Sequence, residues 1–97
     1  MLPMPIADSS RVTPSADAVV REVNGEAVLL HLTTSQYHVL DPISTEMWRA
    51  LLDATSFAIA VDVIHGEFDV DREQLRADLE LFVEQLVERG LVRLDGA

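Results

Sequence analysis

The chain has 97 residues, of which 48% are hydrophobic and 25% are charged, so it can form one domain with a small core. Its formal net charge is -10, and its 7 basic residues are all arginines. This acidic balance disfavours binding to nucleic acid or to anionic membranes. The absence of cysteine excludes disulfides and cysteine-ligated zinc. No apolar run approaches the roughly 20 residues that cross a bilayer, so we expect a soluble cytoplasmic protein.

The beginning of the chain has the composition of an arm. Three of the four prolines lie within residues 1–14, together with Ser9 and Ser10. Such a composition is typical of extended and mobile segments. We therefore expect a flexible N-terminal arm over residues 1–17 and a folded domain over residues 18–94.

A β-hairpin is predicted directly after this arm. Asn24 and Gly25 tolerate the positive φ that a tight two-residue turn demands, and they separate two apolar segments. A looser turn then leads to a third segment that is bounded by polar residues and contains Tyr37 and Val39. The three predicted strands cover residues 18–23, 27–32 and 36–40, and they form an antiparallel meander.

Three helices are predicted after the meander, over residues 42–52, 57–65 and 72–89. Asp41 and Asp71 can cap the first and third helices, and Pro42 suits the first position of a helix. Gly66 and Gly90 stand at the expected ends of the second and third helices. The fold class is therefore α+β, with a three-stranded antiparallel sheet followed by three helices. The apolar tail after Gly90 is expected to return to the core.

The second predicted helix is ambiguous. Its β-branched residues also permit a strand, whereas its cap and its terminal glycine favour a helix. On a helix, Ile59 and Val63 lie one turn apart and outside the main apolar stripe. This pair indicates contact with a partner molecule, and contact with another element of the same domain is an equally open interpretation.

The residues that could support chemistry are few. His31 and His38 could approach each other across two strands, but no further metal ligand is evident near them in the sequence. There is no lysine for a Schiff base, and the four glycines are scattered, so no phosphate-binding loop is present. We therefore expect no catalytic residues, no metal, no cofactor and no enzymatic activity.

A binding surface remains at the third strand. One edge of this strand is paired in the meander, and the other is free unless another element covers it. A peptide can add to such an edge as a further strand. Tyr37 and Val39 share one face of the strand and His38 and Leu40 share the other, but a one-residue change of register reverses which pair faces the core. The sequence leaves that choice open.

Two runs of the sequence resemble the PqqD-like family of RiPP recognition elements, and most of all its stand-alone members in lasso-peptide biosynthesis. The runs are L-L-H-L-T-T-S-Q-Y-H-V-L-D-P-I-S-T-E-M-W, which ends at Trp48, and D-L-E-L-F-V-E-Q-L-V-E-R-G-L-V, which begins at Asp78. The resemblance implies a winged-helix-like fold and binding of the leader segment of a precursor peptide as an added strand beside the last helix. It also implies presentation of a leader of the Tyr-x-x-Pro type to a partner leader peptidase.

The resemblance also implies which residues bind the peptide. The strand edge would be formed by Ser35, Gln36, Tyr37, His38 and Val39, and the groove wall by Leu75, Asp78, Leu79 and Phe82. Ile59 and Val63 become candidates for docking the peptidase.

Two other functions stay open at this point. A winged-helix DNA-binding regulator fits the predicted elements, although its recognition helix would have to be basic, and the third predicted helix carries more acidic than basic residues. A small structural subunit could instead dimerise through Ile59 and Val63. The oligomeric state is not determined by the sequence.

Overall fold

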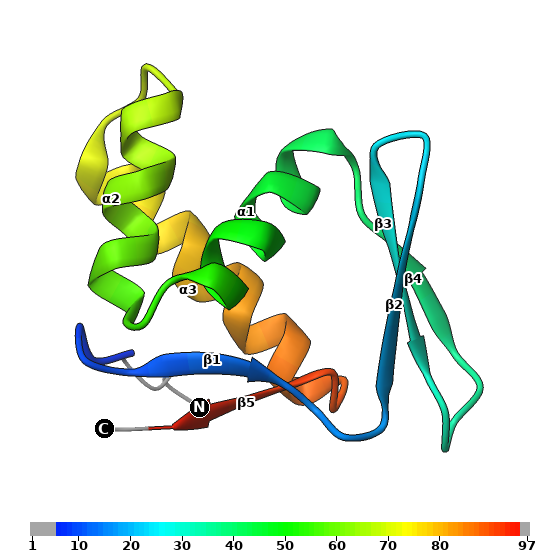
Figure 1. Cartoon of the computed structure of the whole chain (residues 1–97). Helices are drawn as coiled ribbons and strands as arrows, with labels where there is room; N and C mark the ends of the chain where they lie inside the picture. Colours follow the sequence, from blue (N-terminus) through cyan, green and yellow to red (C-terminus); the bar gives the residue numbers. More distant parts are fainter. Residues whose placement is uncertain (1–5, 96–97) are drawn as a thin grey trace.

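The computed structural model describes residues 6–95. In chain order the elements are β1 (Arg11–Pro14), β2 (Ala18–Val23), β3 (Glu26–His31), β4 (Tyr37–Val39), α1 (Pro42–Asp53), α2 (Phe57–Glu67), α3 (Arg72–Glu88) and β5 (Val92–Asp95). Strands β2, β3 and β4 form one antiparallel sheet in that order, and β1 pairs with β5 (Figure 1). The predicted α+β fold with a three-stranded sheet followed by three helices is confirmed.

The turn between β2 and β3 forms as the sequence predicts. Asn24 has φ 53° and Gly25 has φ 82°, and Val23 pairs with Glu26 across the turn. The turn before β4 is different, because Ser35 has a φ of 59°. A residue with a Cβ pays a steric cost in this left-handed region, so the chain holds this turn with hydrogen bonds to its backbone. The N–H of Ser35 donates to the carbonyl of His31 at 2.8 Å.

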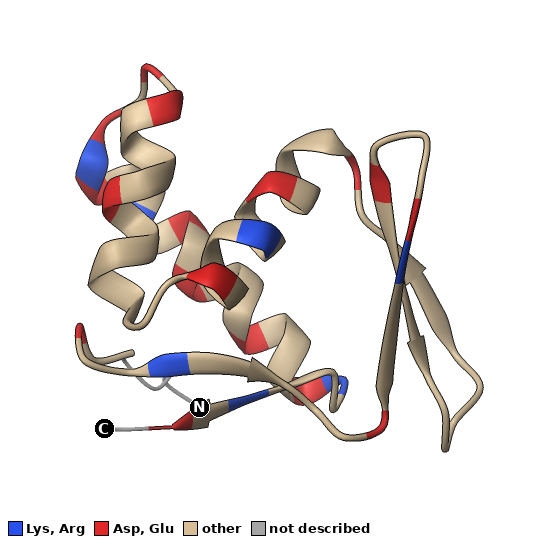
Figure 2. Ribbon diagram, in the orientation of Figure 1, with Lys and Arg blue, Asp and Glu red and all other residues tan. Residues whose placement is uncertain are grey.

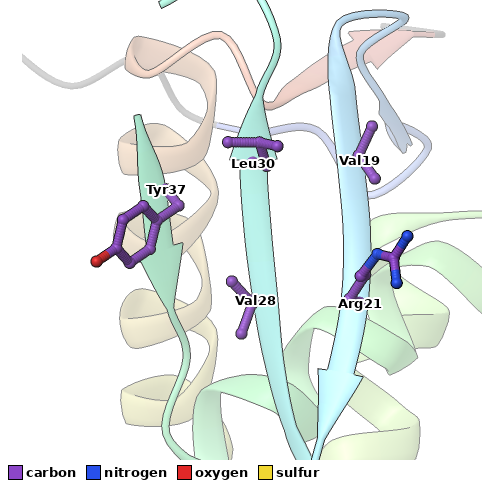
Figure 3. A pocket seen from close by; sticks show the side chains of 5 residues that line it. All are labelled: Val19, Arg21, Val28, Leu30 and Tyr37. Carbon is purple, nitrogen blue, oxygen red and sulfur yellow. The ribbon is translucent and has the colours of Figure 1, made fainter. Parts of the chain in front are cut away.

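The two faces of the sheet are now distinguished. Ala27 and Leu29 are fully buried, and Leu40, just after β4, is 8% exposed. Tyr37 and Val39 are 68% and 58% exposed. Figure 3 shows Tyr37 on the face turned away from the helices, and Val39, two residues further along the strand, shares that face. The question that the sequence left open is therefore answered: the face of Leu40 points into the core and the face of Tyr37 points outward.

Helix α1 is tied to the sheet through Thr45. The hydroxyl of Thr45 accepts a hydrogen bond from the N–H of Ala27 at 3.0 Å and donates to the carbonyl of Leu40 at 3.3 Å. The side chain is fully buried. The N–H of Leu40 donates directly to the carbonyl of Ala27 at 2.8 Å. The reciprocal bond of this ladder pair, from the N–H of Ala27 to the carbonyl of Leu40, is replaced by the Thr45 hydroxyl as the chain turns from β4 into α1. Asp41 caps α1 by accepting from the N–H of Ser44 at 2.7 Å.

Helices α2 and α3 differ in how well the sequence predicts them. Asp71 caps α3 by accepting from the N–H of Gln74, and Gly90 follows the helix with φ 70°. Helix α2 is confirmed as a helix, but it continues past Gly66 to Glu67, so the end predicted at Gly66 is wrong. A Cβ added at Gly66 would meet nothing within 4 Å, and its φ is not positive, so nothing at this glycine forces the helix to stop.

The N-terminal segment is part of the fold from residue 6 onward, which corrects the arm predicted for residues 1–17. Ile6 and Val12 are 4% and 2% exposed, and β1 is hydrogen-bonded to β5. The carbonyl of Ser10 accepts from the N–H of Phe57 at 2.7 Å, so this segment satisfies a free donor at the start of α2. Arg76 of α3 holds it by donating to the carbonyl of Ile6 at 3.0 Å. Residues 1–5 lie outside the described residues.

The C-terminal tail returns to the core, as predicted. Leu91 is fully buried, Val92 is 3% exposed, and the tail continues as β5. Over residues 6–95, none of the helices has the length and apolar character that crossing a membrane requires.

Candidate functional site

Among residues 6–95, nothing pairs with the backbone along one edge of β4. The N–H of His31 donates to the carbonyl of Gln36, and the N–H of Leu40 donates to the carbonyl of Ala27, at 2.9 and 2.8 Å. In an antiparallel ladder such pairs alternate with pairs that are not hydrogen-bonded. Gln36, His38 and Leu40 therefore turn their backbone groups toward β3. The N–H and C=O groups of Tyr37 and Val39 point to the free edge.

The sheet has a second edge, on β2, and a charged side chain on this strand opposes pairing with another chain. By the same alternation, Val20 and Glu22 turn their backbone groups outward from β2. The carboxylate of Glu22 pairs with Arg49 of α1, which also pairs with Glu46. A charged side chain on an edge strand opposes pairing with another chain, because pairing would disturb its ion pair. The segment from Gln36 to Leu40 carries no acidic or basic residue apart from His38. On β4, therefore, no ion pair opposes the addition of another strand.

Helix α3 runs along the free edge of β4. A Cβ added to Gly90, which follows α3, would lie 3.0 Å from the Nε2 atom of His31, so the C-terminal end of α3 meets the end of the sheet where β4 begins. Near its other end, Asp78 shares a hollow with Ile43 of α1, which follows directly after β4. Helix and strand therefore run in opposite directions, as Figure 3 shows behind Tyr37.

A hollow of about 230 Å³ lies at the α1 end of this edge. Its lining is mostly apolar and comes from all three helices and from the loop between α2 and α3: Ile43, Met47, Ile64, Phe68, Val70, Gln74, Leu75 and Asp78. The sequence predicted the last two as groove residues and missed the residues from α1 and α2. Ile43 and Met47 stand four residues apart, so they share one face of α1, and this spacing was the available signal. Ile43 is 61% exposed and is free to contact a ligand.

The other predicted groove residues take different positions. Phe82 is half-buried and packs against the core, so one part of its ring remains accessible. Leu79 is fully buried, which corrects its prediction as a wall residue: it supports the wall from beneath and offers a peptide no surface. Ser35 and Gln36 are exposed in and just after the turn before β4. Because the N–H of Ser35 already has a partner, the usable edge begins after it.

The outer face of the sheet carries a second hollow, of about 270 Å³ (Figure 3). It is lined by Val19, Arg21, Val28, Leu30 and Tyr37. Tyr37 belongs both to this hollow and to the free edge. A strand added to β4 would therefore extend the same apolar face.

The two histidines of the sheet, His31 and His38, do not lie directly opposite each other on β3 and β4. His31 accepts a hydrogen bond through its Nδ1 atom from the N–H of Thr34 at 3.3 Å, and His38 pairs with Leu29 rather than with His31. Burial lowers the pKa of His38, and the nearby Arg89 lowers it further, which favours a neutral ring at pH 7. Among residues 6–95, no group of three or more histidine and acidic side chains is placed to hold a metal ion.

Comparison with known proteins identifies the family. The family model "Coenzyme PQQ synthesis protein D (PqqD)" matches residues 26–92. The solved structure "TbiB1 in Complex with the TbiA(beta) Leader Peptide" is similar at 31% identity and a TM-score of 0.73, covering 93% of this chain and 95% of that one. "Lasso peptide synthetase B1 complexed with the leader peptide" shares the fold, with 24% identity, a TM-score of 0.75 and coverage of 88% and 98%. No curated protein matches the chain.

The match to the family model spans more than half of the chain and includes the whole of β3, β4 and the three helices. The similarity to TbiB1 extends over nearly the full length of both proteins. Domains of this kind bind a ligand and do not catalyse a reaction. The chain therefore belongs to the PqqD family and is a RiPP recognition element.

Proposed function

We propose that this chain binds the leader segment of a lasso-peptide precursor as an additional β-strand on β4. The observation that carries the proposal is the free edge at Tyr37 and Val39, whose backbone groups point away from the sheet beside α3. The likeness to TbiB1, whose solved structure contains a leader peptide, supports the same class of ligand here. Backbone hydrogen bonds would supply affinity, and side-chain contacts in the groove would supply sequence preference.

A leader of the Tyr-x-x-Pro type fits this mode of binding. Along a strand, successive N–H groups point alternately toward and away from β4. The tyrosine and the proline are three positions apart, so when the tyrosine bonds to β4 the proline N position faces away. Proline has no N–H to donate and is tolerated only at such a position.

Hydrogen exchange tests the proposal at single residues. The probe is a synthetic lasso-precursor leader peptide of the Tyr-x-x-Pro type. We expect the amides of Tyr37 and Val39 to exchange quickly in the free protein and slowly in the complex, because the added strand supplies their acceptors. The amides of Val20 and Glu22, on the other free edge, serve as the matched control and should keep their rates. Unchanged exchange at Tyr37 and Val39 in a saturated complex would refute strand addition.

We also propose that the bound leader is presented to a partner leader peptidase, with Ile59 and Val63 of α2 as the docking residues. Both side chains lie on the outer side of α2 and are 44% and 47% exposed. Paired branched apolar side chains on an exposed helix face are typical of a contact with another protein. The sheet is remote from this face (Figure 1), so docking there leaves the bound leader accessible.

A charge at this face should separate docking from leader binding. Ile59→Asp is expected to slow cleavage of the precursor by the peptidase by roughly tenfold, since a carboxylate would be buried at the contact. Its affinity for the leader should not change. Val87→Asp, at an apolar residue of similar exposure on α3, is the control. Equal cleavage rates for the two variants would argue against α2 as the docking face.

The distribution of charge favours a peptide over nucleic acid as the ligand. Acidic residues are spread over the helices, and α3 lacks a continuous basic face (Figure 2). Three of the arginines, Arg49, Arg72 and Arg76, are engaged in ion pairs with carboxylates. A DNA-binding helix needs free cations along one side to meet the phosphates.

A further inference from the structure

One face of α3 carries a stripe of residues along the groove. The stripe consists of Leu75, Asp78, Phe82, Gln85 and Arg89, which follow one another at steps of three and four residues. Residues at these steps lie above one another on a helix. Two of them place the stripe beside β4: Asp78 lines the hollow next to α1, and Arg89 lies close enough to His38 to influence its pKa.

The stripe has opposite charges at its two ends. Asp78 is exposed and accepts a hydrogen bond from the amide of Gln74 at 2.9 Å. Arg89 is exposed at the other end. Within residues 6–95 neither Asp78 nor Arg89 belongs to an ion pair.

The middle of the groove is apolar and β4 contributes no charge of its own. Phe82 and the uncharged Gln85 lie between Asp78 and Arg89, and His38 is the only titratable side chain on the inner face of β4. Asp78 and Arg89 are eleven positions apart on the helix, which corresponds to about 16 Å along the axis. An extended peptide covers this distance in roughly five residues. Two charged side chains of a bound strand that both face α3 would then stand four or six residues apart.

We propose that Asp78 and Arg89 fix the direction in which the leader strand runs, by selecting a leader with a basic side chain at the α1 end and an acidic side chain at the Arg89 end. The proposal rests on the proposed strand addition and extends it to the charge order of the ligand. Backbone pairing alone does not choose between the two directions, because both parallel and antiparallel strands bond to an edge. Two charges of opposite sign at the ends of the groove favour one direction of the strand, since reversing the strand brings like charges together.

The test uses two synthetic leader peptides of identical composition. In both, all charged residues of the leader are replaced by glutamine except one lysine and one glutamate, six residues apart. The peptides differ only in the order of these two residues. The other side chains of the leader are identical in the two peptides and favour the same direction on β4, so only one order places the lysine beside Asp78 and the glutamate beside Arg89. We expect the wild-type protein to bind this peptide about three- to tenfold more tightly, as two exposed ion pairs permit. The difference should shrink at high salt.

Charge reversal of the protein supplies the decisive comparison. The double variant Asp78→Arg, Arg89→Glu should prefer the opposite peptide by a similar factor, and both substitutions are at exposed positions that the fold tolerates. Glu84→Arg is the matched control, because Glu84 lines a separate hollow with Ile6 and Val87 on another side of α3. It should keep the wild-type preference.

Each outcome has a separate meaning. Equal affinities of the two peptides for the wild type, or an unchanged preference in the double variant, would overturn the assignment of direction to Asp78 and Arg89. Failure of strand addition would instead be seen as rapid exchange at Tyr37 and Val39 in the saturated complex.

Discussion

Replacing Val39 by proline is expected to lower the affinity for the leader peptide by roughly a hundredfold while the domain stays folded. The N–H of Val39 points to the free edge, so its loss removes no bond of the sheet. It removes one bond to the incoming strand, and the proline ring occupies the space where that strand must approach. Isothermal titration with the leader peptide, together with the circular dichroism of the variant, measures both parts of the expectation.

The matched control is proline at Val20 on the opposite edge of the sheet. Its N–H also points outward, so the Val20→Pro variant carries the same kind of change without touching β4. It should bind the leader like the wild type. Proline at His38 would be no control, because that residue bonds to β3 and the variant would lose part of the sheet. A folded Val39→Pro variant with wild-type affinity would show that the leader does not pair with β4.

Replacing Thr45 by valine is expected to lower the free energy of unfolding by about 1 to 3 kcal/mol. Valine has nearly the same shape, so the packing of this fully buried side chain is kept. The change removes the hydroxyl that accepts from the N–H of Ala27 and donates to the carbonyl of Leu40. Both backbone groups then stay buried without a partner, which costs more than the bond itself contributed. Urea unfolding followed by fluorescence of Trp48 measures the loss.

The Thr45→Ser variant distinguishes the contribution of the hydroxyl to stability from that of the methyl group. Serine keeps both hydrogen bonds and loses only one methyl group, so its unfolding free energy should fall by about 1 kcal/mol or less. If the valine variant were as stable as the serine variant, the hydroxyl would not be what joins α1 to the sheet. Because Leu40 directly follows β4, we also expect the valine variant to show faster amide exchange at the end of β4.

The parts of the fold that the sequence predicted correctly are those encoded by neighbouring residues. Asn24 and Gly25 define a turn by their own backbone preferences, and Asp41 caps a helix only three residues away. The pairing of β1 with β5 joins segments at opposite ends of the chain, and neither segment has a local signal of its own. Composition indicated an arm, whereas the burial of Ile6 and Val12 depends on surfaces that exist only after folding.

The candidate site shows the same division. The edge of β4 could be predicted, because a meander always leaves its last strand with one open side. The sequence could not show which face of that strand is turned to the core. Tyr37 and His38 are equally suited to a half-buried position, and the register depends on pairing with β3. The hollow beside α1 was missed for a different reason: it is formed by three helices whose relative positions no local pattern contains. Ile43 becomes part of the site only through that packing.

The pairing of β1 with β5 has a practical consequence for attaching this domain to other molecules. The two strands are antiparallel, with Arg11 beside Asp95, so the chain enters and leaves the domain at one place. That place is remote from β4 (Figure 1). A tether, a fluorescent label or a fused enzyme joined through these strands would leave the groove unobstructed. Tension on both tethers would load the β1–β5 pair and the hydrogen bonds of Ile6 and Ser10 to α3 and α2 before it reached the peptide-binding sheet.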